Sequence, residues 1–278
     1  MIAVTDIGWK AHAALERAGG LARALAPLSE SIYLRAADEI VWLGGPGSPL
    51  HPRAILTGGP LGLRADVVWI DATSTRPWRA KPFRFTPGSA AAIVDGCRRL
   101  GAALQTVGVP RGLGTLLVDA GSFNRGAGDD EFLDRAAPWA RALARACATE
   151  EHAGAVEAAS TLLGLGPGLT PAGDDYVGGA FFARVLLARA GAADREAWAT
   201  AASTVLGRAA DLTHPVSAAL LADLLEGDGH APLHDLARAL AEAGPLEAIV
   251  DAARRLVALG HSSGWDILAG FIGGATGA

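Results

Sequence analysis

The sequence predicts an α+β protein, with a β-rich, barrel- or sandwich-like N-terminal part packed on a mostly α-helical C-terminal part. Short β-like runs separated by glycine and proline fill the first ~120 residues. Helical runs then follow one another from residue 131 to the C-terminus. Because strands precede helices instead of alternating with them, an alternating parallel α/β fold is excluded. We therefore predict a β-rich subdomain over residues 1–125 and a helical subdomain over residues 126–278.

The N-terminal subdomain begins with a helix predicted over residues 11–26, where alanine, leucine and arginine recur at mixed spacing. Runs rich in β-branched and aromatic residues follow, and turn formers such as the Gly/Pro segment at residues 44–49 separate them. A second helix is expected at residues 89–104. The expected strands cover residues 31–35, 39–43, 53–57, 66–71, 83–85 and 114–119.

The C-terminal subdomain is expected to consist of helices connected by short loops. The first of them should be interrupted at Pro138, because proline lacks the N–H that the helix needs. The helix after residue 175 is apolar on every face and must therefore be buried. The expected helices cover residues 131–149, 151–163, 175–190, 195–210, 216–225, 233–243, 246–258 and 264–272.

Composition and charge exclude several classes of protein. The net charge of −5 leaves no basic excess for a phosphate backbone, so nucleic-acid binding is not expected. No apolar stretch is long enough to span a membrane, and the N-terminus lacks a signal-peptide pattern. Cys97 and Cys147 lie far apart and fit buried free thiols better than a disulfide or a zinc site. We expect a cytoplasmic protein that binds neither nucleic acid nor membrane.

The most informative segment is residues 164–175, which is rich in glycine and ends in two acids before the buried helix. Thr170 and Pro171 have the form of an N-cap followed by proline at the first helical position. Asp174 and Asp175 are predicted to hold Mg²⁺ or a substrate amide or ammonium group. In the alternative interpretation they only complement the helix dipole. The residues expected to hold an anion through this loop are Gly166, Gly168, Leu169, Thr170 and Gly173.

Two further helix starts carry polar residues. At residues 213–217, Thr213 can cap the helix and Ser217 is available to a ligand, although capping alone explains the segment. At residues 260–266, Ser263 and Asp266 have the spacing of a capping box, and Asp266 fits a cap and a ligand contact equally well. His261 and Ser262 precede this helix and are further candidates for ligand binding.

Three such starts in one helical subdomain predict that their N-termini converge on a pocket for a small polyanion. Asp174, Asp175 and Asp266 would then act on the substrate's donor groups or on a metal, and they are the predicted catalytic residues. The sequence indicates no organic cofactor. It has no Gly-Lys-Ser/Thr of a phosphate-binding P-loop and no nucleophile elbow, so covalent catalysis is not indicated.

The run Leu-Leu-Gly-Leu-Gly-Pro-Gly-Leu-Thr-Pro-Ala-Gly-Asp-Asp-Tyr-Val-Gly-Gly closely resembles the AllH family. The later Thr213 to Ser217 segment and the run Gly-His-Ser-Ser-Gly-Trp-Asp-Ile-Leu-Ala-Gly match that family in order and spacing. The resemblance extends from about residue 150 to the C-terminus. The family includes a subunit of oxamate carbamoyltransferase, a multi-subunit enzyme of allantoin breakdown that converts oxalurate and phosphate to oxamate and carbamoyl phosphate.

The resemblance implies a small carboxylate or carbamoyl ligand, phosphate and partner subunits of a carbamoyltransferase. The leading hypothesis is therefore a component of such an enzyme, acting on a small ureido carboxylate. A non-catalytic subunit that binds a metabolite or supports assembly is an alternative. A stand-alone Mg²⁺-dependent hydrolase of a related small acid is another.

Overall fold

The computed structural model describes residues 2–59, 66–118 and 130–278. The chain divides into two compact units, Met1–Lys81 with Gly229–Ala231 and Pro82–Asp228 with Pro232–Ala278. We call them the barrel unit and the helical unit and describe each by itself. The strands lie in the first and most of the helices in the second, which confirms the predicted α+β class. The predicted boundary between residues 125 and 126 falls outside the described residues.

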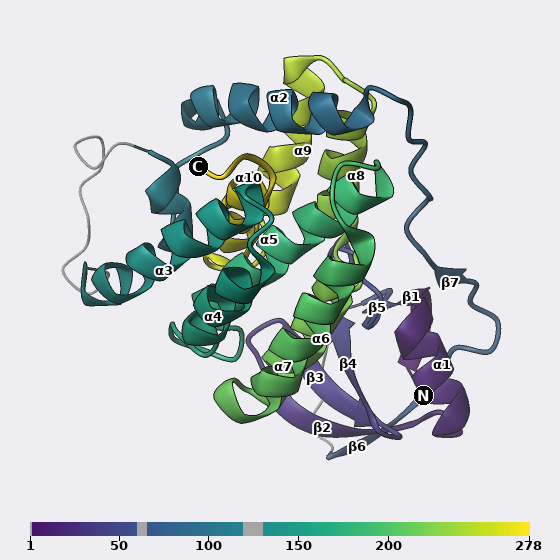
Figure 1. Ribbon diagram of the computed structural model, residues 1–278. Coiled ribbons are helices and arrows are strands. Elements are labelled where there is room, and N and C mark those ends of the chain that lie inside the picture. Colours follow the sequence, from purple (N-terminus) through teal and green to yellow (C-terminus); the bar gives the residue numbers. More distant parts are fainter. Residues whose placement is uncertain (1, 60–65, 119–129) are drawn as a thin grey trace. The chain divides into compact units, whose positions relative to one another are not determined.

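In the barrel unit, six strands close into a barrel in the order β5-β4-β3-β2-β6-β1, because β1 also pairs with β5 (Figure 1). A seventh strand, β7, pairs with β1 outside this ring. The core contains apolar side chains of the strands and one face of the helix α1 (Trp9–Arg17). The strands are β1 (Ile2–Gly8), β2 (Leu21–Pro27), β3 (Ser31–Ala36), β4 (Glu39–Gly44), β5 (Ala54–Thr57), β6 (Val67–Asp71) and β7 (Pro77–Trp78).

The helix predicted over residues 11–26 is wrong in its second half. Helix α1 ends at Arg17, and the chain turns through Gly19 and Gly20, which have φ values of 58° and 83°. These left-handed conformations suit glycine and end the helix. The following residues form β2, which pairs with both β3 and β6. Pairing with two neighbouring strands thus overrides the helical propensity of its alanine and leucine residues.

Two predicted strands are also wrong. Residues 83–85 are not a strand, and Phe83 and Phe85 instead pack against the core of the helical unit. Residues 112–117 form a 3₁₀ helix, η2 (Gly112–Leu117), and Asp119 lies outside the described residues. This segment packs directly on a helix, because a Cβ at Gly114 would lie 2.9 Å from the Cβ of Trp265. No strand lies beside it among the described residues.

The helical unit confirms the predicted succession of helices, with ends shifted by a few residues. Helix α3 is not interrupted at Pro138 as predicted. Pro138 is exposed, so the carbonyl group that loses its partner can bond to water while the opposite face packs. The helices are α2 (Ser89–Ala102), α3 (Asp130–Ala148), α4 (His152–Leu162), α5 (Ala172–Arg189), α6 (Arg195–Leu212), α7 (Pro215–Leu225), α8 (Ala231–Ala241), α9 (Leu246–Val257) and α10 (Ser263–Thr276), with the short 3₁₀ helix η1 (Leu104–Thr106).

Helices α5 and α10 lie side by side and are buried over most of their length (Figure 1). Glycine allows their backbones to touch. A Cβ at Gly270 would overlap the carbonyl oxygen of Tyr176, and a Cβ at Gly179 would overlap that of Ile267. The glycines of both helices therefore serve close packing, and this packing fixes where the two N-termini lie.

A partly buried ion pair connects the α3–α4 turn to α5. The guanidinium of Arg184, which is 4% exposed, forms an ion pair with Glu150. The other carboxylate oxygen of Glu150 accepts a hydrogen bond from Trp198 Nε1 at 2.9 Å. The Arg184 guanidinium also lies 4.9 Å from the centre of the Trp198 ring. Burial disfavours the charged form of the guanidinium and lowers the pKa of Arg184.

Glu150→Gln is expected to lower the free energy of unfolding by about 2 kcal/mol, because it leaves a buried guanidinium without a counter-charge. The estimate lies below that for a fully buried pair, since the Glu150 side chain is 38% exposed and partly screened by solvent. Urea unfolding followed by circular dichroism measures the change. Glu157→Gln, on the exposed face of α4, is the matched control and should leave stability unchanged. Equal stability of the two variants would contradict a structural role for the ion pair.

Cys97 and Cys147 are both buried free thiols, as predicted. Burial raises the pKa of each thiol to about 12, so neither is a reactive thiolate near neutral pH. No helix within residues 2–59, 66–118 and 130–278 combines the length and the hydropathy of a membrane span.

Candidate functional site

Two side-chain contacts connect the three predicted helix starts, one through Asp174 and one between Thr170 and Ser263. Oδ1 of Asp174 accepts a hydrogen bond from the Gly164 N–H at 2.7 Å. Its Oδ2 accepts a hydrogen bond from the Thr213 hydroxyl, at the start of α7. The Thr170 and Ser263 hydroxyl oxygens lie 3.4 Å apart, which connects the start of α5 to that of α10. Asp174 thus closes the glycine-rich loop and anchors it to the next helix start.

The loop before α5 has a conformation that requires glycine. Gly164, Gly166 and Gly168 have φ values of 75°, 121° and 91°, a region that other residues rarely adopt. Gly168 and Pro167 are exposed, whereas Leu169 and Thr170 are half-buried. The loop therefore forms a fixed, partly exposed cover over the N-terminus of α5.

Asp175 and Asp266 form a pair of buried carboxyl groups in the first turns of α5 and α10. Asp175 is 7% exposed and Asp266 is fully buried. Oδ1 of Asp266 accepts a hydrogen bond from the Leu113 N–H at 2.6 Å. The Oδ2 atoms of both aspartates are buried and have no hydrogen-bond partner within the described structure. Unsatisfied buried oxygens are costly, so this pair is the strongest indication of a ligand in the helical unit.

The environment favours the neutral form of both carboxyl groups. Burial raises the pKa of Asp175 well above its ordinary value, and the charges of Asp266 and Asp174 add to this effect. Burial also raises the pKa of Asp266 to about 7, against the opposing hydrogen bonds from the Leu113 N–H and Ser262. Near neutral pH the pair therefore retains at least one proton, which suits proton transfer or hydrogen bonding to a ligand.

The segment Arg111–Gly112–Leu113 belongs to this site and was not predicted. Besides the Leu113 N–H, it contributes Gly112, whose φ is 53° and whose Cβ would overlap the Asp266 carboxylate. Nη1 of Arg111 donates to the carbonyl oxygen of His261 at 3.2 Å. The sequence signal is the glycine pair in Pro-Arg-Gly-Leu-Gly, of which Gly114 begins the strand predicted over residues 114–119. The tertiary fold brings this segment to Asp266, which lies about 150 positions later in the sequence.

The predicted caps of these helices are wrong in detail. Pro171, not Thr170, occupies the N-cap position of α5 and offers no side-chain acceptor. His214 caps α7 by accepting from the Val216 N–H, while Thr213 binds Asp174. At α10 the N-cap is Ser262, and no capping box forms because Asp266 binds Leu113 instead. Pro215 does occupy the first turn of α7, as predicted.

The remaining predicted residues vary in their surroundings. The Gly173 N–H donates to Leu165 at 2.9 Å, so this backbone donor is already used inside the protein. Ser217 is buried in the first turn of α7, and no hydrogen bond within the described structure links it to the aspartate pair. His261 is exposed, and its carbonyl oxygen accepts from Arg111. Ser262 and Ser263 are half-buried beside the pair.

The predicted magnesium site at Asp174 and Asp175 stays a prediction. Both carboxylate oxygens of Asp174 already accept hydrogen bonds from the protein. Within the described ranges, no group of three or more His, Cys, Asp or Glu side chains could hold a metal ion. Among the described residues, the carboxyl groups that have a buried oxygen without a hydrogen-bond partner are those of Asp175 and Asp266.

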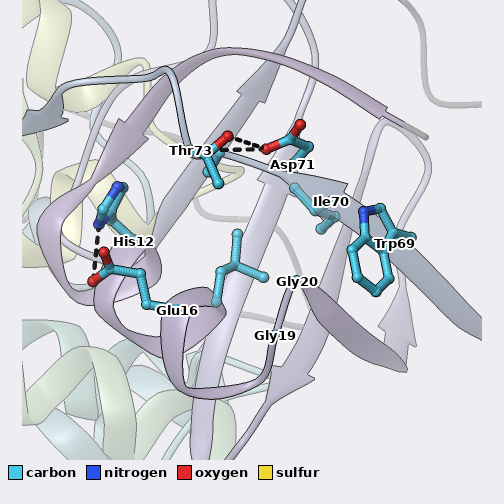
Figure 2. Close-up of a pocket in the computed structure, with 10 residues that line it drawn as sticks. His12, Glu16, Gly19, Gly20, Trp69, Ile70, Asp71 and Thr73 are labelled. Carbon is cyan, nitrogen blue, oxygen red and sulfur yellow. Dashed lines mark hydrogen bonds and ion pairs between the residues drawn. The ribbon is translucent and has the colours of Figure 1, made fainter.

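A separate cavity of about 460 Å³ lies in the barrel unit (Figure 2). Leu15 and Ile70 form part of its apolar wall, and the Trp69 indole stands opposite an ion pair between His12 and Glu16 at 3.4 Å. None of the residues that line it is a predicted site residue. None of the residues that line this cavity has a buried side-chain oxygen or nitrogen without a hydrogen-bond partner. We therefore place the candidate site at the aspartate pair.

Comparisons with known proteins bear on the helical unit. Comparisons with curated proteins and with solved structures gave no match. One family model does match, and its segment includes Asp174, Asp175, Thr213 and Asp266 but not Arg111. Residues 162–275 match the family described as oxamate carbamoyltransferase subunit AllH, and the predicted resemblance is thereby confirmed over this segment.

Proposed function

We propose that the chain is a component of a carbamoyltransferase that converts a small ureido carboxylate, oxalurate, and phosphate to oxamate and carbamoyl phosphate. The observation that carries the proposal is the Asp175–Asp266 pair, in which each carboxyl group has a buried oxygen without a partner. The family match over residues 162–275 supports the choice of reaction.

The reaction requires a proton to move between the two substrates. A phosphate oxygen attacks the carbamoyl carbon of oxalurate, and the bond from that carbon to the oxamate nitrogen breaks. HPO₄²⁻ loses its proton, and the departing nitrogen gains one to become the amide of oxamate. A carboxyl pair that retains a proton near neutral pH can donate to the nitrogen and accept from phosphate. In this proposal Asp175 and Asp266 are the catalytic residues, and Asp174 positions the loop.

Access to the pair requires movement of its cover. The Asp175 and Asp266 Oδ2 atoms are shielded from solvent, and Thr170 and Ser263 lie side by side at the starts of the two helices. Their 3.4 Å separation is a weak hydrogen bond, so separating the two hydroxyl groups costs little. The proposed anion contacts are the backbone N–H groups of Gly166, Gly168, Leu169 and Thr170 and of residues 261–263, which the helix dipoles reinforce.

Asp175→Asn is expected to reduce oxalurate-dependent formation of carbamoyl phosphate by about 10²- to 10⁴-fold, because a carboxamide cannot transfer the proton. The assay uses the full chain assembled with the other subunits of the enzyme. Thermal unfolding should show no loss of stability, since asparagine resembles the neutral carboxyl group that burial favours. Asp211→Asn, an exposed aspartate on α6, is the matched control and should keep full activity.

An unchanged rate in Asp175→Asn would remove the catalytic role of this carboxyl group. Oxalurate binding without turnover by the complete assembly would instead indicate a non-catalytic binding subunit. Turnover by the chain alone that EDTA abolishes would support the stand-alone metal-dependent hydrolase.

A further inference from the structure

Arg111 brings a positive charge to the entrance of the site. Its side chain is exposed, and Nη1 donates to the His261 carbonyl oxygen at 3.2 Å, in the loop that leads into α10. Two residues later, the Leu113 N–H binds Asp266 at 2.6 Å. The Arg111 guanidinium is thus held against the loop before α10, and the backbone that follows Arg111 contacts Asp266. No carboxylate within the described ranges pairs with its guanidinium.

The start of α10 is a position that attracts an anion more than a cation. The N-terminus of a helix carries a partial positive charge, which repels a guanidinium and attracts an anion. Arg111 and the N-terminal turn of α10 therefore present two positive groups to the same space. The unsatisfied Oδ2 atoms of Asp175 and Asp266 indicate independently that a ligand with hydrogen-bond donors enters beside it.

We propose that Arg111 binds the carboxylate of the ureido acid and so makes the site specific for anionic substrates. This inference rests on the function proposed above and adds a residue outside the segment that matches the family. The guanidinium can form two parallel hydrogen bonds to a carboxylate, which fixes the orientation of the bound acid. The ligand's N–H group then points toward Asp175 and Asp266.

The length of the substrate favours the carboxylate over phosphate as the group that Arg111 binds. In oxalurate a single carbonyl carbon separates the carboxylate from the nitrogen that leaves. A group that binds this carboxylate must therefore lie close to the acid that protonates the nitrogen. Arg111 meets this condition, because the next two residues, Gly112 and Leu113, touch Asp266. Phosphate attacks from the far side of the carbamoyl carbon, away from the carboxylate.

The test compares binding of oxamate with binding of oxamide, its neutral analogue, by calorimetry of the full chain. The unmodified protein should prefer oxamate by about 10- to 100-fold, the preference expected of a charge-assisted pair. Arg111→Gln should reduce this preference to about threefold or less, and Arg111→Lys should restore part of it because it keeps the charge but not the paired donors. Arg98→Gln, an exposed arginine on α2, is the matched control.

In the assembled enzyme, Arg111→Gln should raise the KM for oxalurate by at least about tenfold and leave the KM for phosphate unchanged. A change confined to the KM for phosphate would assign Arg111 to phosphate and overturn the inference. An unchanged preference for oxamate over oxamide in Arg111→Gln would also overturn it, while leaving the proposed function intact. Failure of the unmodified chain to bind oxamate, together with an active Asp175→Asn enzyme, would overturn both.

Discussion

Gly270→Ala is expected to lower the free energy of unfolding by about 3 kcal/mol or more. The added Cβ would overlap the carbonyl oxygen of Tyr176, and a backbone atom cannot move aside as a flexible side chain can. Alanine has a higher helix propensity than glycine by about 1 kcal/mol. The free energy lost through the overlap must therefore exceed this gain before the variant becomes less stable. The measurement is urea unfolding of the full chain, with circular dichroism as the signal.

Gly207→Ala in α6 is the matched control for this prediction. A Cβ at Gly207 meets no atom within 4 Å, so the substitution should stabilise the protein by about 1 kcal/mol through helix propensity alone. If Gly270→Ala is insoluble while Gly207→Ala folds, the result would support the backbone contact between α5 and α10 at Gly270. Equal stabilisation by both substitutions would show that α5 and α10 do not approach as closely as described.

The same glycine contact determines the chemistry of the candidate site. Because α5 and α10 pack backbone to backbone, Asp175 is buried and lies close to Asp266, and its pKa is raised first by burial and then by the charge of Asp266. A variant that separated the helices without unfolding them would weaken this interaction. The pKa of Asp175 would then fall toward its ordinary value, and the proposed proton donor would be ionised near neutral pH.

Local sequence patterns predicted the elements whose conformation depends on residues close by in the sequence. The Gly-rich loop before α5 was predicted as a rigid approach to a buried helix, and the three positive φ values agree with that. The convergence of the helix starts followed from three similar patterns in one subdomain. Thr213 and Ser263 were expected there, although as a helix cap and part of a capping box, whereas their side chains contact Asp174 and Thr170.

Long-range pairing accounts for what the sequence did not reveal. Residues 21–27 have a composition typical of a helix, and they form a strand only because β3 and β6 lie on either side. Arg111 and Leu113 reach the site from a 3₁₀ helix that packs on α10, and no periodicity in their own segment indicates this. The spacing of Ser263 and Asp266 fits a capping box, but the Asp266 carboxylate accepts from the Leu113 N–H, about 150 residues away in the sequence.

Asp266→Asn is expected to stabilise the protein at pH 8 by as much as about 4 kcal/mol while abolishing turnover. Burial raises the pKa of Asp266 from 3.8 to about 7, so the folded state holds this proton more tightly than the unfolded chain does. The stability contributed by the protonated carboxyl group is therefore full below pH 4 and is lost as the pH rises to about 7. Asparagine has no proton to lose, so its stability should not show this decline.

Urea unfolding at pH 4, 6 and 8 tests the prediction, with Asp211→Asn as the exposed control. The stability gain of Asp266→Asn over the unmodified chain should be near zero at pH 4 and grow toward pH 8. Parallel pH profiles would show that Asp266 is not held neutral by its surroundings. His51, whose pKa does not depend on Asp266, is shared by both proteins and cancels in the difference. Asp175 does not cancel, because the charge of Asp266 raises its pKa, so the measured difference belongs to the two carboxyl groups together.

A stable but inactive Asp266→Asn protein would identify the reason for burying this carboxyl group. A buried acid whose pKa is raised by folding lowers stability as the pH rises from the unfolded toward the folded pKa, and a neutral isostere removes that loss. If the acid served only to fix Leu113, the carboxamide oxygen would accept the same hydrogen bond and activity would persist. Opposite changes in stability and turnover would instead mean that the protein retains a destabilising group because the reaction requires its proton.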